Sequence, residues 1–336
     1  MKKLFYLGII LFAACTDQID KKTEFPDLTG EYLGQELPGD SAILFAPEIV
    51  STGLADRDIA IYPDGSEIYF CKNTLNFKYS TIFYTKIVNG KWTEPKVLEF
   101  ASNPNYIFIE PHISPDGKKF YFASNKQVEG NEPGSMEIWV SDRTGDSWGE
   151  PYNSRAPINT ESDQYFPSVT KKGTMYFTSE DSITNEEFIY RSKLVDGVYQ
   201  KQEKLPENVN IGLVRYNAYI SSNEDYIIVP GYIKEDTYGG TDYYIVFRDE
   251  NDNWSKPMNM GKPVSSKNRW EWSACVSPDG KYIFFMSDGL DENHEVSDPI
   301  TMKDYEKLHN LPQNGLSDIY WAKTDFIKEL RKRAEF

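Results

Sequence analysis

A strand–turn–strand unit recurs five times along this chain, and this repeat constrains the fold more than any other feature. Each unit has an apolar strand, a tight turn and a second strand rich in aromatic and β-branched residues. Three of the five turns read Ser/Tyr-Pro-Asp-Gly, in which Pro presets φ and Gly accepts a positive φ. A period of about 50 residues indicates a repeat architecture. Equivalent turn positions lie 52, 56, 51 and 56 residues apart, at Asp64, Asp116, Lys172, Asn223 and Asp279.

Two further strands complete each unit. A third apolar strand follows after a loop of variable length, and a turn then leads to a Trp-x-x-Pro element, in which Tyr199 replaces the Trp of the third unit. Pro in this element suits an outer edge strand, which makes fewer ladder hydrogen bonds. Four antiparallel strands per period predict an all-β fold, a single β-propeller of five four-stranded blades. We expect the third strands at 81–84, 137–140, 188–190, 243–247 and 318–321, and the Trp-x-x-Pro elements at 92–95, 148–151 and 254–257.

The fifth unit lacks a fourth strand of its own. After Trp321 the chain continues as residues 325–333, which read as a short surface helix. A piece similar to the fourth-strand element occurs instead at the front of the domain, at residues 44–50. An open ring would leave unpaired strand edges. We therefore predict that this N-terminal piece pairs beside residues 318–321 and closes the ring.

The repeat resembles that of TolB-type, WD-like propellers over about residues 43–327. The motifs that carry the resemblance are the three Pro-Asp-Gly turns and Gly239-Gly-Thr-Asp242, which precedes a third strand. The third and fourth units depart from the family's Pro-Asp-Gly pattern, so the geometry of their turns is open. The lead-in at residues 32–39 is similar to that of Bacteroidetes lipoproteins that carry these repeats. The resemblance implies a propeller domain over residues 40–336 and assigns it no settled function.

The first residues have the pattern of an export signal. Two lysines precede an apolar run over residues 4–12 that is too short to span a bilayer, and Ala13-Ala14-Cys15 follows. Cys15 resembles the lipidated cysteine of a bacterial lipobox, although Phe12 stands where that motif usually has Leu. We expect residues 1–14 to be removed, Cys15 to be lipidated and the polar segment 15–39 to be a tether. The expected location is the cell envelope, anchored by lipid in the outer membrane; an ordinary secreted protein is the alternative.

Charge and cysteine usage narrow the classes of partner. The formal net charge is −16, which repels phosphate backbones, so we expect no nucleic-acid partner. An export compartment permits a disulfide between Cys71 and Cys275, but both lie in apolar strand sequences that suit unpaired, buried cysteines. No Cys/His cluster has zinc spacing. We expect a monomer without a metal or cofactor.

The residues that precede the first strand of each unit are the candidates for a binding site. In a propeller, the links from each fourth strand to the next first strand gather at one mouth of the central channel. The aromatic, amide and charged side chains there are typical of carbohydrate sites, and two arginines favour an acidic glycan. The same residues also suit a wet channel in which Arg57–Asp58 or Arg215–Glu271 simply pair. The predicted ligand-binding residues are Arg57, Gln164, Tyr165, Arg215, Tyr216, Asn217 and Trp272.

Three functions remain open at this mouth. The first is recognition of a glycan or of a partner protein in the envelope. The second is catalysis on a polysaccharide, by a glycoside hydrolase or a lyase, with Asp58, Glu110, His112 and Glu271 as the catalytic candidates. The third is an envelope scaffold. The long insertion at residues 288–316 is acidic, but its spacing does not match an EF-hand, and we interpret it as a solvated loop.

Overall fold

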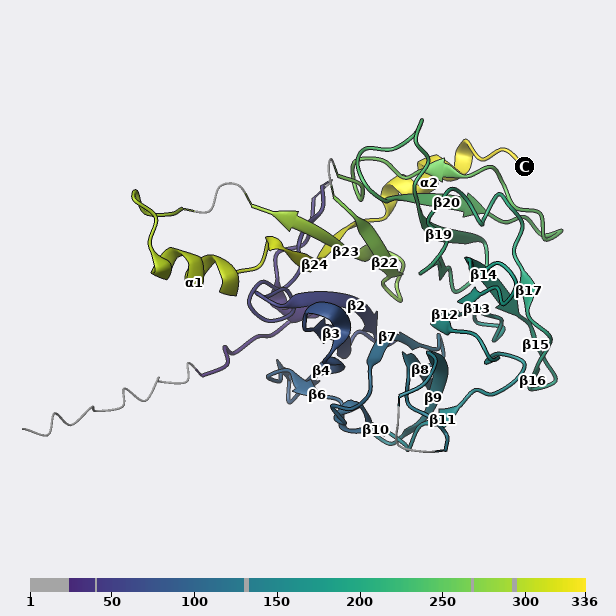
Figure 1. The fold of residues 1–336 in the computed structure, drawn as a ribbon, viewed down its shortest axis with the longest axis horizontal. Helices are drawn as coiled ribbons and strands as arrows, with labels where there is room; N and C mark the ends of the chain where they lie inside the picture. The colour runs from purple at the N-terminus through teal and green to yellow at the C-terminus, as the bar shows by residue number, and fades with distance from the viewer. Residues whose placement is uncertain (1–23, 40, 130–132, 267–268, 292–294) are drawn as a thin grey trace, which may run out of the picture.

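The computed structural model describes residues 24–39, 41–129, 133–266, 269–291 and 295–336. Small antiparallel sheets surround a central axis, and each innermost strand contacts the innermost strand of the next sheet until the ring closes (Figure 1). The predicted five-bladed β-propeller is therefore confirmed. The expected signal sequence at residues 1–14 and the expected lipidation site Cys15 lie outside the described residues. In the described part of the chain, no helix is long and apolar enough to cross a membrane.

The five blades follow one another along the chain, each running from the axis outward. Blade 1 has β2 (Ala55–Ile61), β3 (Glu67–Asn73), β4 (Ser80–Val88), β5 (Lys91–Trp92) and β6 (Lys96–Val97). Blade 2 has β7 (Phe108–Ile113), β8 (Lys119–Ser124), β9 (Glu137–Thr144), β10 (Ser147–Trp148) and β11 (Tyr152–Asn153). Blade 3 has β12 (Gln164–Val169), β13 (Met175–Glu180), β14 (Glu187–Ser192) and β17 (Glu203–Lys204), with a two-stranded ribbon of β15 (Leu194–Val195) and β16 (Val198–Tyr199). Blade 4 has β18 (Tyr219–Ile220), β19 (Tyr226–Gly231), β20 (Asp242–Phe247) and β21 (Met258–Asn259). Blade 5 has β22 (Glu271–Val276), β23 (Tyr282–Leu290), β24 (Asn314–Lys323) and β1 (Ile43–Leu44).

The turn between the first two strands has the same backbone in every blade. In blade 1 the Gly65 amide donates to the Tyr62 carbonyl at 2.8 Å, and equivalent hydrogen bonds occur in the other four blades. The fourth blade lacks the glycine, and Glu224 takes the left-handed conformation there with φ 62°. Its carboxylate accepts a hydrogen bond of 2.8 Å from Tyr176 of blade 3. Contact with the neighbouring blade thus accompanies the turn geometry where Pro-Asp-Gly is missing.

The outer strand is interrupted at its proline in the first two blades. Trp92 pairs with one end of β4 and Lys96–Val97 pairs further along the same strand, so Pro95 lies between two short pieces. Blade 2 repeats this division with Trp148 before Pro151 and β11 after it. The missing amide of Pro explains the gap in each ladder.

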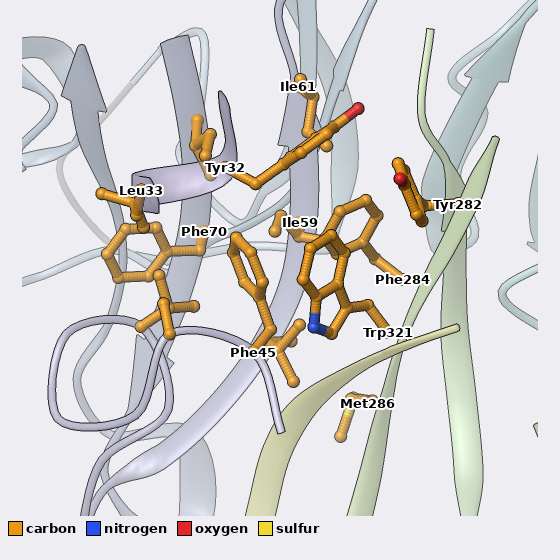
Figure 2. Close-up of a cluster of buried hydrophobic side chains, with 14 of the residues drawn as sticks. Tyr32, Leu33, Phe45, Ile59, Ile61, Phe70, Tyr282, Phe284, Met286 and Trp321 are labelled. Carbon is orange, nitrogen blue, oxygen red and sulfur yellow. The ribbon is translucent and has the colours of Figure 1, made fainter. Parts of the chain in front are cut away.

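The N-terminal segment closes the ring in two ways. Ile43 and Leu44 pair with Trp321 and Tyr320 of β24, as predicted. A second contact lies upstream, where η1 (Glu31–Gly34) places Tyr32 in an aromatic cluster with Phe45 and Trp321 (Figure 2). Tyr32 and Leu33, within the segment expected to be a tether at residues 15–39, are buried in the propeller core, so the segment is anchored to the domain at this point.

The described part of the chain has two α-helices outside the blades. The C-terminal helix α2 (Asp325–Lys332) is confirmed and buries Ile327 and Leu330 against blades 4 and 5. Helix α1 (Met302–Asn310) lies between β23 and β24, projects away from the ring and buries none of its residues (Figure 1). The insertion predicted as a loop therefore contains a helix, which Thr301 and Asp304 cap reciprocally.

Candidate functional site

A β-bulge recurs at one position in the innermost strand of the blades. The residue at this position has a positive φ in all five blades, although none of the five is glycine. In the first three blades and the fifth, the strand pairing shifts register at this point. A bulge bends the strand and redirects the neighbouring side chains. The five positive-φ residues, called the bulge residues below, are Asp58, Glu110, Phe166, Asn217 and Ser273; Asn217 shares the backbone conformation but lies just before β18.

The residue just before each bulge faces a single cavity at the mouth of the channel. This cavity, called the mouth cavity below, has a volume of about 590 Å³. Apolar side chains make much of its wall, including Phe77 from the first blade and Met286 from the fifth. Each blade contributes its pre-bulge side chain to the lining: Arg57, Ile109, Tyr165, Tyr216 and Trp272.

This alignment corrects the sequence analysis in the second blade. Glu110 was grouped with residues at the start of the other innermost strands, but it occupies the bulge itself. Ile109 takes the cavity-facing position equivalent to Tyr165, and sequence reasoning missed it. The 52-residue spacing from Arg57 could have identified Ile109, because the turn positions of blades 1 and 2 have the same spacing.

The side chains of the bulge residues connect adjacent blades. The Asp58 carboxylate accepts from the backbone amide of Glu110 at 3.2 Å, and the Glu110 carboxylate accepts from the backbone amide of Phe166 at 2.7 Å. On the other side of the ring, the Asn217 amide donates to the Ser273 hydroxyl at 2.9 Å. These contacts place Asp58 and Glu110 in the joints between blades.

Arg57 reaches both of these carboxylates. Its Nε lies 2.7 Å from Asp58 and one terminal nitrogen lies 3.2 Å from Glu110, while the guanidinium stacks 5.2 Å from the Phe77 ring centroid. Burial and the neighbouring Asp58 charge raise the pKa of Glu110, despite the opposing effect of Arg57. Arg57 lines the cavity, but its charge is already paired with two carboxylates.

Three half-buried carboxylates that the sequence analysis did not single out also line the mouth cavity: Asp163, Glu187 and Asp288. Each accepts one hydrogen bond, from Met136 N at 2.9 Å, Tyr165 Oη at 2.5 Å and Trp270 N at 2.7 Å respectively. A search for acidic residues at the strand ends that face the mouth would have identified all three from the sequence.

Asp58 lines a small inner cavity instead of this one, and four other predicted site residues also lie outside its lining. Gln164 hydrogen-bonds to Thr160 and Ser179, and Glu271 accepts from the Ser266 hydroxyl at 2.6 Å. Both side chains fold back to support the loop before their strand.

The other two are a histidine and an arginine. His112 lines a small inner cavity of about 20 Å³ and accepts from Val169 N at 2.9 Å; burial lowers its pKa to about 4. Arg215 pairs with Glu186 at 3.4 Å and stacks on Phe188. Only one of the two predicted arginines therefore belongs to the mouth cavity.

The structure does not bring the four catalytic candidates together as a set of free groups. Asp58 and Glu110 share Arg57 and hold backbone amides of the next blade, and of the four candidates only Glu110 lines the mouth cavity. Cys71 and Cys275 are both free. No group of three or more His, Cys, Asp or Glu that could hold a metal occurs among the described residues.

Replacing Glu271 by Gln is expected to change how stability depends on pH. Burial raises the pKa of Glu271 to about 7, and its Oε2 atom has no hydrogen-bond partner. An acid whose pKa is higher in the folded state stabilises the fold while protonated, and this contribution is lost as pH rises through 7. Gln cannot titrate, so the stability of Glu271→Gln relative to wild type should rise by about 1–3 kcal/mol between pH 5 and pH 8.

Chemical denaturation of both proteins at the two pH values measures this difference. The control is Glu207→Gln, at an exposed position, whose stability relative to wild type should be the same at both pH values. A constant difference between wild type and Glu271→Gln would contradict the prediction.

Comparisons with known proteins find similarity only at the level of the fold. No protein-family model matches the chain, and no curated protein matches it. Solved structures with a similar fold include the β-propeller domain of the Trilobed protease from Pyrococcus furiosus, which is 17% identical over 69% of this chain and 65% of that one, with a TM-score of 0.36.

Two further structures are similar to the same degree. The periplasmic gluconolactonase of Pseudomonas aeruginosa is 10% identical over 70% of this chain and 69% of that one, with a TM-score of 0.36. An oligogalacturonate lyase in complex with manganese is 10% identical over 79% of this chain and 64% of that one, with a TM-score of 0.41. Similarities this distant say nothing about what this chain binds.

Proposed function

We propose that this propeller is a carbohydrate-binding module and that the mouth cavity is its site. The observation that supports this most is the convergence of one pre-bulge side chain from every blade on a single cavity, with Tyr165, Tyr216 and Trp272 among them. A volume of about 590 Å³ is in the range of ligand sites, which combine apolar walls with a few placed polar groups.

The chemistry of the wall suits a sugar. Aromatic faces can pack against the C–H surfaces of a pyranose ring, while hydroxyl groups need polar partners around it. Glu187, Asp163 and Asp288 supply acceptor oxygens at the same cavity. Apolar faces and acceptor oxygens thus line the same cavity.

The charge of the site argues against an acidic ligand. The expectation of an acidic glycan depended on two arginines, but Arg215 pairs with Glu186 elsewhere and Arg57 is engaged by Asp58 and Glu110. A carboxylated or sulfated glycan would meet Glu187, Asp163 and Asp288 without a free cation. We therefore propose a ligand that is not anionic.

Binding is favoured over catalysis for a similar reason. Hydrolysis or elimination requires a proton donor and acceptor that face the substrate. Of the predicted candidates Glu110 does line the mouth cavity, but its carboxylate already accepts from the Phe166 amide and pairs with Arg57. Asp58 holds the backbone of the next blade outside that lining, and Glu271 supports a loop. The envelope scaffold remains the competing function, and the experiment below distinguishes it.

A glycan array probed with the full-length protein tests the proposal. We expect binding to at least one non-anionic oligosaccharide, and a loss of about tenfold or more in affinity for Tyr216→Ala and Trp272→Ala, because truncating a central aromatic contact commonly costs over 1 kcal/mol. Tyr305→Ala is the matched control, since Tyr305 is 59% exposed on helix α1.

Three outcomes would count against the carbohydrate site. Absence of binding to every glycan, together with specific capture of an envelope protein, would favour the scaffold. Binding that survives both cavity substitutions would place the site elsewhere. Appearance of cleaved products would favour the enzyme.

A further inference from the structure

We infer that the mouth cavity selects glycans that carry free amino groups, that is, hexosamine units without an N-acetyl group. This inference rests on the proposed function and specifies its ligand class. It follows from an excess of hydrogen-bond acceptors and negative charge in a cavity with aromatic walls.

Three carboxylates at the cavity have oxygens that can accept further hydrogen bonds. Asp163 and Glu187 approach the cavity from blade 3 and Asp288 approaches from blade 5. Each uses one oxygen to accept a protein hydrogen bond. Within the described part of the chain, the second oxygen of each has no hydrogen-bond donor and none of the three carboxylates forms an ion pair with a basic side chain.

The described cavity lining holds no unpaired basic side chain that could neutralise these carboxylates. Arg57 is the one basic residue in the described lining, and it already contacts Asp58 and Glu110. The negative potential of Glu187 extends over the cavity wall: after burial, its charge is the next largest cause that raises the pKa of Tyr165 and of Tyr216. The Arg57 charge opposes this effect on the pKa of Tyr216 but not on that of Tyr165, so an ammonium group would meet the least opposing charge on the Tyr165 side of the cavity.

Uncharged acceptors in the cavity wall point to the same kind of ligand. Two asparagines line the same cavity, Asn73 in blade 1 and Asn217 in blade 4, and among the described residues their side-chain carbonyl oxygens have no hydrogen-bond donor. Their side chains are enclosed, since the residues are only 6% and 3% exposed. A buried acceptor without a donor is unfavourable, and a ligand N–H group that reaches it would satisfy it. An acceptor-rich wall therefore favours a donor-rich ligand.

The aromatic wall suits the same ligand. A cation within about 6 Å of an aromatic ring centroid is attracted to the face of the ring, and Trp and Tyr are the strongest partners. Tyr216 and Trp272 can thus contact the pyranose ring and favour an attached ammonium at the same time. Acetylation of the nitrogen would remove the charge and two of its N–H donors.

The test compares two tetrasaccharides that differ only at nitrogen. The probes are the β-1,4-linked glucosamine tetramer and the N-acetylglucosamine tetramer, titrated calorimetrically into the full-length protein at pH 6. We expect the glucosamine tetramer to bind at least about tenfold more tightly, and this preference to shrink in 0.5 M NaCl because salt screens charge attraction.

A pair of neighbouring substitutions identifies the groups responsible. Glu187→Gln retains an acceptor for the Tyr165 hydroxyl but removes the charge, so it should reduce the preference at least about threefold and leave the affinity for the N-acetylated tetramer nearly unchanged. Asp288→Asn should act in the same direction. The matched control is Glu186→Gln, because Glu186 is the adjacent carboxylate and pairs with Arg215 outside the cavity; it should leave the preference intact.

The outcomes separate this inference from the proposed function. Equal binding of both tetramers, or tighter binding of the N-acetylated one, would overturn the amine preference while the carbohydrate site stands. A preference that survives both Glu187→Gln and Asp288→Asn would also overturn it. Absence of binding to either tetramer and to every glycan of the array would instead reject the proposed function itself.

Discussion

Trp321→Ala is expected to lower the free energy of unfolding by about 3–5 kcal/mol, the range for truncating a large buried aromatic side chain. The Trp321 side chain is fully enclosed at the seam where the ring closes. Its ring packs 5.4 Å from Tyr32 and 5.2 Å from Phe45, both from the N-terminal segment, and 5.5 Å from Phe284 of its own blade (Figure 2). Loss of the indole removes packing on both sides of the closure.

Chemical denaturation of the full-length variant measures this effect. Trp270→Ala is the matched control, because Trp270 is 45% exposed and its truncation should cost less than about 1 kcal/mol. Equal stabilities of the two variants would show that the N-terminal closure contributes little to the fold.

Arg143→Met is expected to destabilise the protein by about 3–5 kcal/mol, because removal of one partner leaves a buried charge unpaired. The Arg143 guanidinium of blade 2 grips the Glu67 carboxylate of blade 1 through two nitrogens, at 2.9 and 2.5 Å. Glu67 is only 5% exposed and also accepts from the Tyr69 hydroxyl. The loss should therefore exceed that of any exposed ion pair.

A second substitution tests the cause. Glu67→Gln added to Arg143→Met removes the unpaired charge but keeps an acceptor for Tyr69, so the double variant should regain part of the lost stability. Arg331→Met is the matched control, since its pair with Asp225 is exposed and should contribute less than about 1 kcal/mol. A double variant less stable than Arg143→Met alone would contradict the unpaired-charge explanation.

The functional candidates show where sequence reasoning succeeded and where it did not. The prediction that the segments before the inner strands converge was useful: Arg57, Tyr165, Tyr216 and Trp272 line one cavity. The assignment within those segments was less accurate. A one-residue bulge decides which side chain faces the cavity, and a bulge depends on pairing with the next strand, which no local pattern reports.

The sequence by itself determined the number of blades, their strand order and the way the ring closes. These features follow from local chemistry that is repeated: Pro-Asp-Gly turns, alternating apolar strands and a proline in the outer strand. The missing fourth strand of the last unit and its counterpart before the first unit predicted the pairing of Leu44 with Tyr320. Repetition made weak signals additive, because each unit supports the same assignment.

Only the tertiary structure decided which polar groups are free. Arg57 and Arg215 are both predicted at the cavity because each lies near the start of an inner strand, yet Arg57 lies beside Glu110 of the next blade, whereas Arg215, one position earlier in its unit, pairs with Glu186. Likewise, the burial of Tyr32 and Leu33 depends on contacts with segments far away in the chain, and so does the number of Glu187 oxygens that accept a hydrogen bond. The charge of a site is the sum over all blades that meet there, and this sum is defined only once the ring has closed.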